Sequence, residues 1–406
     1  MKANSASNRY RAVMEPSARL GQVMTPQPLA DAVMRLLGSR GGRWLELGSG
    51  SGRLAEAIYN RAGPVSYLGI EMDEAMIDLS PVLPGFTYLK QDVLSVTSLT
   101  HSLGRQKFDH VIGNPPYGIN GLSDEAKVRI QTLCPELEIQ GNWAPIDLYF
   151  VLESLSRLRS NGTGAFIVGA DIPCGIRNQQ FRKMIVETAS EIECYELPPT
   201  TFGSSAEVQA YILIVRFGRG RTRHVSLGRL NGQYEVTSLR QFDRALAIES
   251  MDLRDHEFGE MDAALRRSSH GITMRDLDVS IVRGSRSRRQ FSQLGVRHFH
   301  TSDFPKSGME ISLECESVTE YQQATVGDVL LPRVGTRCLG HKAVVVGGRS
   351  PYSEAVFRVR TPVKYRERVE RWITSDECSN WRLSAARGAC AKHLTVSTLL
   401  GMPVPT

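Results

Sequence analysis

The first half of the chain alternates short apolar runs with amphipathic helical patterns, and this alternation restricts the possible folds more than any other feature of the sequence. Strands that alternate with helices form a mainly parallel sheet with helices on both faces. A run of β-branched and aromatic residues, Val208–Phe217, predicts a late antiparallel strand of the same sheet. The other predicted strands are Arg43–Leu47, Tyr67–Glu71, Phe86–Lys90, Phe108–Gly113 and Gly164–Val168, with helical stripes at Leu54–Ile58 and Leu148–Leu158.

The second half has a different character. The chain has 406 residues, which is enough for two domains. The basic, glycine-containing segment Gly218–His224 suits a boundary, and residues 225–270 give mixed signals. Short strand-like pieces then precede a helical pattern at Tyr365–Ile373. We therefore expect an α/β domain at residues 1–224, a connecting region at 225–270 and an α+β domain at 271–406.

The net charge of +6 is distributed unevenly along the chain. Residues 1–218 carry 20 Lys and Arg against 22 Asp and Glu, whereas residues 219–406 carry 29 against 21. This excess of positive charge indicates an acidic partner for the second half, with nucleic acid as the first candidate. A solvated basic face would give the same composition.

Several other classes of protein are excluded. No apolar run is long enough to span a bilayer, and the N-terminus lacks the apolar core of a secretory signal. Seven scattered cysteines without CxxC spacing argue against a disulfide framework and against a zinc site, so we expect no metal. These features predict a protein of the reducing cytoplasm that does not act at a membrane.

A glycine-rich turn, Glu46–Gly52, follows the first predicted strand and precedes a helix. Glycine lets the backbone turn sharply and approach a ligand closely. The GxGxG spacing differs from the GxGxxG of dinucleotide-binding folds, and no Lys-Ser/Thr pair follows as in a phosphate-binding P-loop. Glu71 ends the second strand, where a carboxylate can accept the hydroxyls of a ribose, and Asp92 follows the third. Together these positions outline one nucleoside-sized crevice.

The tetrapeptide Asn114-Pro-Pro-Tyr117 follows the fourth predicted strand. Asn-Pro-Pro suits an ordinary turn, but a chemical interpretation accounts for every member. The amide oxygen of Asn114 and the carbonyl of Pro115 can accept both N–H groups of an exocyclic amino group. That would localise the nitrogen lone pair, which is otherwise delocalised into the ring. Pro115 and Pro116 make the loop rigid, and Tyr117 offers an aromatic face to a planar base.

The order of these motifs, beginning with Gly21–Pro26, resembles the gamma class of DNA adenine-N6 methyltransferases of restriction–modification systems, which use S-adenosylmethionine. The resemblance implies a Rossmann-like α/β domain whose mainly parallel, seven-stranded sheet contains one antiparallel strand. It also implies a C-terminal α+β target-recognition domain similar to that of type I specificity subunits. The further segments that carry the likeness are Asp147–Tyr149, Gly162–Val168, Thr201–Gly203, Ser280–Arg286, Gly327–Val334 and His393–Pro405.

The resemblance also implies roles for individual residues. Asn114, Pro115, Pro116 and Tyr117 would be catalytic, and Tyr117 and Phe202 would form the walls of a pocket for a flipped base. Phe202 as an ordinary loop aromatic is the alternative. The residues that would bind S-adenosylmethionine are Thr25, Glu46, Leu47, Gly48, Gly50, Glu71, Met72, Asp92, Val93, Asn114 and Pro116.

The expected reaction is direct methyl transfer to adenine N6 in double-stranded DNA, with the base flipped out of the helix because N6 is inaccessible inside a duplex. The basic half would hold the DNA, through phosphate contacts more than through base contacts. The candidate residues are Arg283, Arg286, Arg288 and Arg289, a cluster that would neutralise phosphates, and Arg333 and Arg337, which are candidates for reading guanine in the major groove. We expect a monomer on DNA, whose cognate restriction endonuclease, if it has one, is a separate protein.

Two other functions remain open from the sequence. The same tetrapeptide occurs in protein-glutamine methyltransferases and in some RNA methyltransferases. Glutamine-modifying members usually carry a small helical domain before the catalytic one, whereas a basic domain follows it here. A DNA-recognition protein without activity is the second alternative, and the intact Asn114–Tyr117 motif beside an intact glycine loop argues against it.

Overall fold

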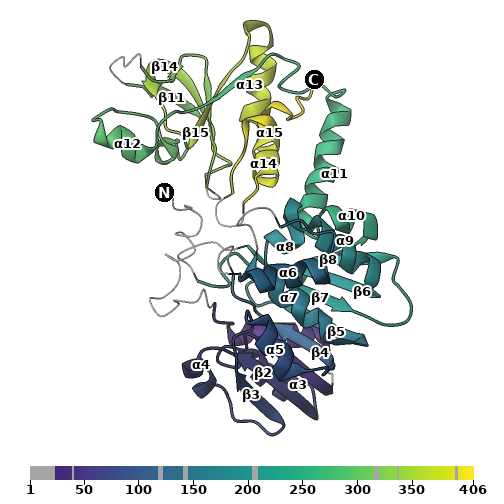
Figure 1. Ribbon diagram of the computed structural model, residues 1–406. Helices are drawn as coiled ribbons and strands as arrows, with labels where there is room; N and C mark the ends of the chain where they lie inside the picture. The colour runs from purple at the N-terminus through teal and green to yellow at the C-terminus, as the bar shows by residue number, and fades with distance from the viewer. Residues whose placement is uncertain are drawn as a thin grey trace. The chain divides into compact units, whose positions relative to one another are not determined.

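A computed structural model of the chain describes residues 23–38, 41–117, 122–139, 145–203, 209–314, 320–335, 338–388 and 392–406. The chain divides into two compact units, Met1–Leu253 and Arg254–Thr406, which are described separately below (Figure 1). Among the described residues, no helix has the length and apolar character needed to cross a membrane.

Nine strands of the N-terminal unit form one sheet in the order β3-β2-β1-β4-β5-β7-β6-β8-β9 (Figure 1). Strands β1 to β5 are parallel, β7 is antiparallel to β5 and β6, and β9 is antiparallel to β8. The strands are β1 (Gly42–Leu47), β2 (Val65–Glu71), β3 (Phe86–Lys90), β4 (Phe108–Gly113), β5 (Leu158–Gly169), β6 (Glu191–Glu196), β7 (Ala210–Arg216), β8 (His224–Leu230) and β9 (Val236–Asp243).

Helices cover both faces of this sheet, because its central strands bury alternate side chains on opposite sides. In β7, Tyr211, Leu213 and Val215 belong to one apolar core, whereas Ala210, Ile212 and Ile214 belong to the other. The first core is completed by α5 (Val96–Leu103), α6 (Asp124–Leu133), α7 (Ile146–Ser156), α8 (Asp171–Cys174), α9 (Gln179–Thr188) and α10 (Arg244–Glu249); the second by α2 (Gln27–Leu37) and α3 (Arg53–Arg61). The short helix α4 (Glu74–Asp78) buries no residue.

The predicted α/β class and the mainly parallel sheet are confirmed. The seven strands β1 to β7 contain one antiparallel member, as expected, and β8 and β9 extend the sheet to nine. Strand β6 was not predicted, although Glu191–Cys194 alternate polar and apolar side chains as a half-buried strand does. Helix α7 ends at Ser156, so Leu158, which the helical stripe included, is the first residue of β5 instead.

The C-terminal unit contains a second sheet in the order β10-β15-β13-β14-β11, with β12 paired to β14. Val329 and Leu331 of β13 face one core, formed with helices α13 to α15, and Leu330 faces another that contains Phe299 and Phe304. Its elements are α11 (Leu253–Ser268), β10 (Ser280–Arg283), α12 (Arg288–Gln293), β11 (Glu310–Leu313), β12 (Gln323–Thr325), β13 (Val329–Pro332), β14 (Ala343–Pro351), β15 (Val356–Arg360), α13 (Arg366–Thr374), α14 (Asp376–Ala385) and α15 (Val396–Leu400).

The boundary between the compact units differs from the expected domain boundaries. Residues 225–270 were expected to connect two domains, but β8 and β9 pair with the large sheet and α10 packs on its core. Residues up to 253 therefore belong to the N-terminal unit. The assignment of separate functions to the ranges 1–224, 225–270 and 271–406 stays a prediction.

Candidate active site

The predicted site residues of the N-terminal unit follow the ends of four adjacent parallel strands, in the order β3-β2-β1-β4 (Figure 1). Parallel strands end at the same edge of a sheet, so Gly48, Glu71, Asp92 and Asn114 are brought to one edge. Between β1 and β4 the chain changes direction across the sheet, and such a switch point is where open α/β sheets form ligand crevices. The sheet therefore gathers residues that lie up to 66 positions apart in the sequence.

The turn after β1 is built on glycines with positive φ angles. Gly48 has φ 75°, Gly50 has φ 52°, and Gly52, with φ 73°, caps the start of α3. A Cβ atom at Gly48 would lie 3.1 Å from the Phe150 ring, whereas one at Gly50 would meet nothing within 4 Å. The middle of the turn thus borders open space, and the buried hydroxyl of Ser51 has no hydrogen-bond partner among the described residues. Both features suit a loop that closes around a ligand.

Glu71 fastens this turn to the end of β2. Its Oε2 accepts the N–H of Gly50 at 2.9 Å, and its Oε1 accepts the N–H groups of Met72 and Asp73 at 2.9 and 3.0 Å. A carboxylate offers about four acceptor positions, so three backbone donors leave roughly one for a ligand hydroxyl. Recognition of both hydroxyls of a ribose by Glu71 would require one backbone donor to give way.

Glu46 is almost completely buried beside the same turn. The hydroxyl of Tyr67 donates to Glu46 Oε2 at 2.5 Å. Burial raises the pKa of Glu46 to about 8, with a smaller contribution from the negative charge of Glu71, although the Tyr67 hydrogen bond opposes the shift. At neutral pH, Glu46 is therefore mainly a neutral acid inside the fold.

The other residues expected to contact an adenine lie in the next two loops. Met72 leaves 45% of its surface exposed, so an apolar side chain is available at the crevice edge. Asp92 is exposed, and its carboxylate accepts the N–H of Leu94 at 2.9 Å. Val93 is buried, and its carbonyl accepts the Tyr149 hydroxyl at 2.9 Å, which anchors this loop to α7.

Asn114 is held by hydrogen bonds at both ends of its amide. Its Nδ2 donates to the carbonyl of Val23 and to the hydroxyl of Thr25, both at 2.9 Å. Its Oδ1 accepts the hydroxyl of Tyr117 at 2.9 Å. Since a carbonyl can only accept a hydrogen bond, the contact with Val23 fixes which end of the amide is nitrogen. The amide oxygen, which has two lone pairs, is thereby directed away from residues 23–25.

Two aromatic side chains expected to enclose a base lie together. The rings of Tyr117 and Phe202 are 6.1 Å apart between centroids and inclined at 61°, an edge-to-face contact. Tyr117 is 7% exposed, and its hydroxyl also lies 3.4 Å from the carbonyl of Ile167. This edge-to-face packing does not leave a gap between the two rings, so a planar base would have to move one of them.

Sequence reasoning missed two contributors to this site. The Val23 carbonyl could not be identified, because backbone groups leave no signal in side-chain patterns. Asp147 was noted only as part of a motif, yet it is buried, and burial together with the charge of Asp171 raises its pKa to about 7. A Cβ at Gly169 would lie 3.5 Å from the Tyr117 ring and 3.6 Å from Asp147 Oδ2, so both side chains lie beside Gly169. The signal that could have found Asp147 is an acid in the first turn of a helix whose next five residues are apolar.

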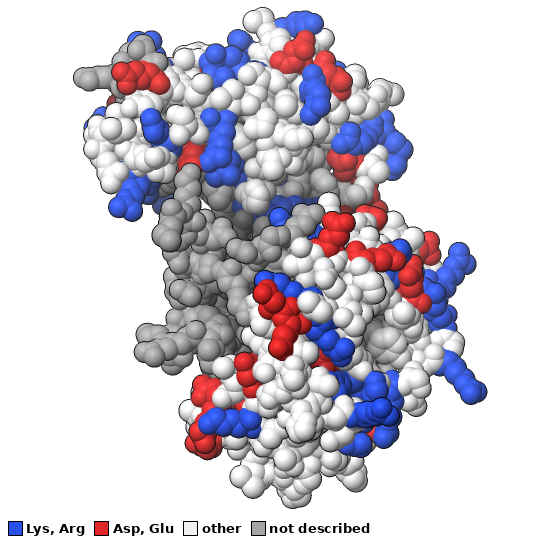
Figure 2. All heavy atoms as spheres, in the orientation of Figure 1, with Lys and Arg blue, Asp and Glu red and all other residues white. Residues whose placement is uncertain are grey.

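The arginines expected to bind DNA fall into two groups in the C-terminal unit. Arg283 forms an ion pair with Glu354, and Arg333 Nε donates to the Glu354 carbonyl at 2.6 Å. The side chains of Arg286, Arg288 and Arg289 are exposed and form no ion pair or hydrogen bond within the described part of the chain. Arg337 lies outside the described residues. Figure 2 shows more Lys and Arg than Asp and Glu on the visible face of this unit, at the top of the view.

Comparisons with known proteins agree with this architecture. The family described as "N-6 DNA Methylase" matches residues 11–258, more than half of the chain. "Type II methyltransferase M.TthHB8I" of Thermus thermophilus is 30% identical over 158 residues, which are 37% of this chain and 35% of that protein. "Defense against restriction protein B" of Escherichia phage P1 is 25% identical over 205 residues, 48% of this chain and 8% of that protein.

The chain thus matches about a third of the first relative and less than a tenth of the second. Among solved structures, the type IIG restriction endonuclease BpuSI aligns with 96% of this chain and 59% of its own, with a TM-score of 0.51 and 12% identity. At that identity the likeness concerns the fold, and it extends over both compact units.

Proposed function

Because the chain belongs to the N-6 DNA methylase family, we propose that it transfers the methyl group of S-adenosylmethionine to N6 of adenine in double-stranded DNA. The observation that carries this proposal is the amide of Asn114, which residues 23 and 25 orient with its oxygen free to accept another donor. The amino group of a base could donate one hydrogen bond to this oxygen and the other to the carbonyl of Pro115, whose ring makes the loop rigid.

The residues at the strand ends suit the proposed cofactor. The open glycine turn at Gly48 and Gly50 would receive its methionine part together with Thr25, Glu46 and Leu47. Glu71 has an acceptor position left for a ribose hydroxyl, and the half-exposed Met72 would pack on the adenine ring, whose edge would meet Asp92 and Val93. When bound, S-adenosylmethionine would supply an electrophilic methyl group whose leaving group is the positively charged sulfur, which departs as a neutral thioether.

The chain's own contribution to the chemistry is orientation. The Asn114 oxygen and the Pro115 carbonyl would accept the two N–H groups of N6, which draws the nitrogen toward tetrahedral geometry and frees its lone pair. Preorganised acceptors of this kind lower the barrier because they need not rearrange during the reaction. Tyr117 would stack on the extruded base. Phe202, which packs edge-to-face with the Tyr117 ring in the structure, would turn aside to form the second wall of the base pocket.

The second unit would position the duplex. Its excess of positive charge and the unpaired Arg286, Arg288 and Arg289 support a role in phosphate binding, and the sequence likeness to type I specificity subunits supports target recognition. We further propose that the protein modifies DNA as a monomer within a restriction–modification system, in the cytoplasm of a bacterium or archaeon.

The decisive experiment is expression in cells that lack DNA methylation, followed by long-read sequencing to map modified adenines. A reproducible short motif methylated at N6 by the wild-type chain, and lost in the Asn114→Ala variant, would support the proposal. Absence of modified adenine, with a tritiated methyl group transferred instead to RNA or to a glutamine side chain, would favour the alternative substrates. Failure to bind S-adenosylmethionine would leave a recognition protein without activity.

A further inference from the structure

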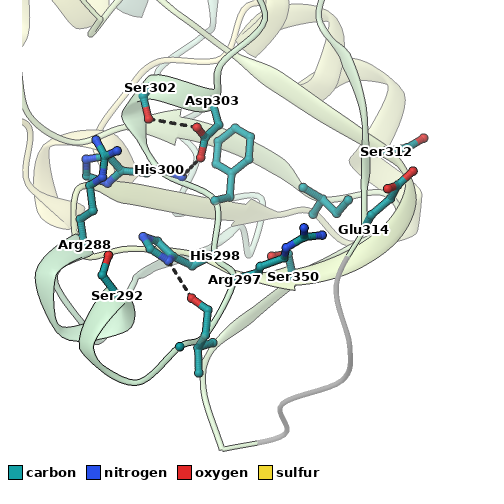
Figure 3. A pocket seen from close by; sticks show the side chains of 14 residues that line it. Arg288, Ser292, Arg297, His298, His300, Ser302, Asp303, Ser312, Glu314 and Ser350 are labelled. Atoms are coloured by element: carbon teal, nitrogen blue, oxygen red, sulfur yellow. Dashed lines mark hydrogen bonds between the residues drawn. The ribbon is translucent and has the colours of Figure 1, made fainter.

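The C-terminal unit contains a cavity of about 480 Å³ that no part of the proposed chemistry uses. It lies between α12, the segment that follows it, and strands β11 and β14 (Figure 3). Its volume is within the range of roughly 300–1,000 Å³ that is typical of ligand pockets. The charged and imidazole side chains that line it are Arg288, Arg297, His298, His300, Asp303 and Glu314.

Hydrogen-bond donors gather at one end of this cavity. Figure 3 shows Arg288 and His300 next to one another, with His298 close by. Arg288 occupies the first turn of α12, where Ser287 and Gln290 form a reciprocal capping box that fixes the helix start. The Arg288 guanidinium has no ion pair or hydrogen bond within the described ranges, and its positive charge acts on the His300 ring. A fixed helix start therefore presents an uncompensated cation to the cavity.

His298 is oriented by its surroundings. Its ring stacks on Phe291, with centroids 4.6 Å apart and an interplanar angle of 22°. Its Nδ1 lies 3.1 Å from the Val296 carbonyl, and because that oxygen can only accept, Nδ1 carries a proton. The other ring nitrogen, Nε2, is then an acceptor in the neutral ring and a donor once the ring is charged.

His300 is held in a similar manner. Its Nδ1 lies 2.7 Å from the Ser353 hydroxyl, and its backbone N–H donates to Asp303 at 2.8 Å. Partial burial lowers the pKa of His300, and repulsion from Arg288 and His298 adds to this, while Asp303 opposes it. The Asp303 carboxylate also accepts the Ser302 hydroxyl at 3.0 Å, so it is already engaged. Figure 3 places Arg297 and Glu314 at the opposite end of the cavity.

We propose that this pocket binds a phosphate group of the DNA backbone through Arg288, His298 and His300. The proposal rests on the proposed function, because it names the part of the second unit that grips the duplex. Donor side chains of this kind suit an acceptor-rich ligand such as phosphate better than a base edge, which presents donors as well. Arg286 and Arg289 are exposed on the same short segment and would meet neighbouring phosphates.

A histidine phosphate site makes a prediction that arginine contacts alone do not make. A negative phosphate between Arg288 and His300 would stabilise the charged imidazole, so binding should take up protons. Affinity for DNA should then increase several-fold when the pH is lowered from about 7.5 to about 6, the interval in which histidine titrates. A site made only of arginine would show no such dependence.

The test uses the full chain and a short fluorescein-labelled duplex, with fluorescence anisotropy recorded at both pH values over a series of salt concentrations. Arg288→Gln should weaken binding about tenfold and reduce the slope of log affinity against log salt by about 0.9. The double variant His298→Gln/His300→Gln should remove the pH dependence. Arg371→Gln is the matched control, since Arg371 is an exposed cation already paired with Glu367, and it should bind and methylate DNA as the wild type does.

The outcomes separate this inference from the proposed function. If the wild type methylates DNA but Arg288→Gln keeps the wild-type slope and the histidine variant keeps the pH dependence, the inference is wrong and the function stands. If DNA binding by the wild type shows the expected pH dependence and the variants change it as expected, but the wild type transfers no methyl group to DNA, the inference stands and the proposed function is wrong. A final measurement titrates the protein with inorganic phosphate alone. Saturation of the pocket by phosphate, with no effect of the variants on DNA binding, would assign it to a small phosphate compound and overturn the inference.

Discussion

The site residues proposed for the first unit and the exposed arginines of the second unit differ in whether other side chains or the backbone hold them in place. At the strand ends of the N-terminal unit, Asn114, Glu71 and Glu46 are each fixed by hydrogen bonds within the unit. In the C-terminal unit, by contrast, the side chains of Arg286, Arg288 and Arg289 have no such partner among the described residues. Residues 1–253 carry 26 Lys and Arg and 26 Asp and Glu, whereas residues 254–406 carry 23 and 17.

This difference follows from what each kind of site requires. A group that must stabilise a transition state works best when its partners hold it in place before the substrate arrives. A surface that must attract a polyanion works best when its cations are not already neutralised by carboxylates. Substitutions in the first unit should therefore change turnover or stability with little effect on salt dependence. Substitutions of the unpaired arginines should change the salt dependence of DNA binding, with little effect on turnover or stability.

The largest effect is expected from Asn114→Ala, which removes the oriented amide. We expect the rate of methyl transfer to fall by about 10²–10³, the range observed when one preorganised electrostatic group is deleted. Affinity for DNA and its salt dependence should not change, because the arginines of the second unit are untouched. Single-turnover transfer of a tritiated methyl group, together with DNA titrations, measures both. A variant that keeps its turnover would remove Asn114 from the chemistry.

Glu46→Gln should alter the pH dependence of stability. The pKa of Glu46 is raised to about 8 in the folded chain from an ordinary value of 4.5, so between these values the unfolded state loses a proton that the folded state keeps. The free energy of unfolding therefore falls as the pH rises from about 4.5 to about 8, by about 1.4 kcal/mol per pH unit at most. Glutamine cannot ionise, so the variant should lack this loss.

The measurement is denaturant unfolding of both proteins at about pH 5 and pH 8, monitored by circular dichroism. The variant should gain stability relative to the wild type by a few kcal/mol between the two pH values. An equal change in both proteins would mean that Glu46 ionises normally in the fold. That outcome would mean that the fold stabilises an ionised carboxylate at this buried position.

The sequence was sufficient for features that depend on local pattern. Strands β3 and β4 begin and end where their apolar runs do, and the turn glycines mark positions with positive φ. The gathering of Gly48, Glu71, Asp92 and Asn114 at one edge follows from the parallel arrangement, because the carboxyl ends of parallel strands meet at the same edge of a sheet, whereas the strand order was not predicted.

Features that depend on distant pairing could not be predicted. Asn114 takes its orientation from residues 89 and 91 positions away, and the Glu46–Tyr67 pair joins neighbouring strands. The residue types of Val23, Thr25 and Tyr67 do not predict these contacts. The sequence distinguished the cluster at Arg283–Arg289 from Arg333 and Arg337, but it did not show that Glu354 engages the side chains of Arg283 and Arg333. Burial and partner choice are properties of the fold, so a run of cations does not reveal which of them are available.

A smaller effect is expected from Thr25→Val, which keeps the shape of the side chain and removes one donor–acceptor contact with Asn114 Nδ2. The Val23 carbonyl still holds the amide, so we expect the loss of one hydrogen bond, about 1 kcal/mol or roughly fivefold in turnover. Thr25→Ser should restore activity. A change confined to kcat would support positioning of Asn114. An increase confined to KM for S-adenosylmethionine would instead support the cofactor contact that the family resemblance implies for Thr25.

The smallest effect, and the most direct test of the contrast, comes from comparing arginines within the second unit. The double variant Arg286→Gln/Arg289→Gln removes two unpaired cations, and the salt slope of DNA binding should fall by about 0.9 for each phosphate that is no longer neutralised. Arg283→Gln changes the charge of the unit by the same amount per residue, but Arg283 is already paired with Glu354. Its removal should change the slope little, because a neutralised cation releases few counterions from DNA. Equal changes per residue in the two variants would show that net charge alone governs binding, and the pairing of individual arginines would then have no bearing on how the unit holds DNA.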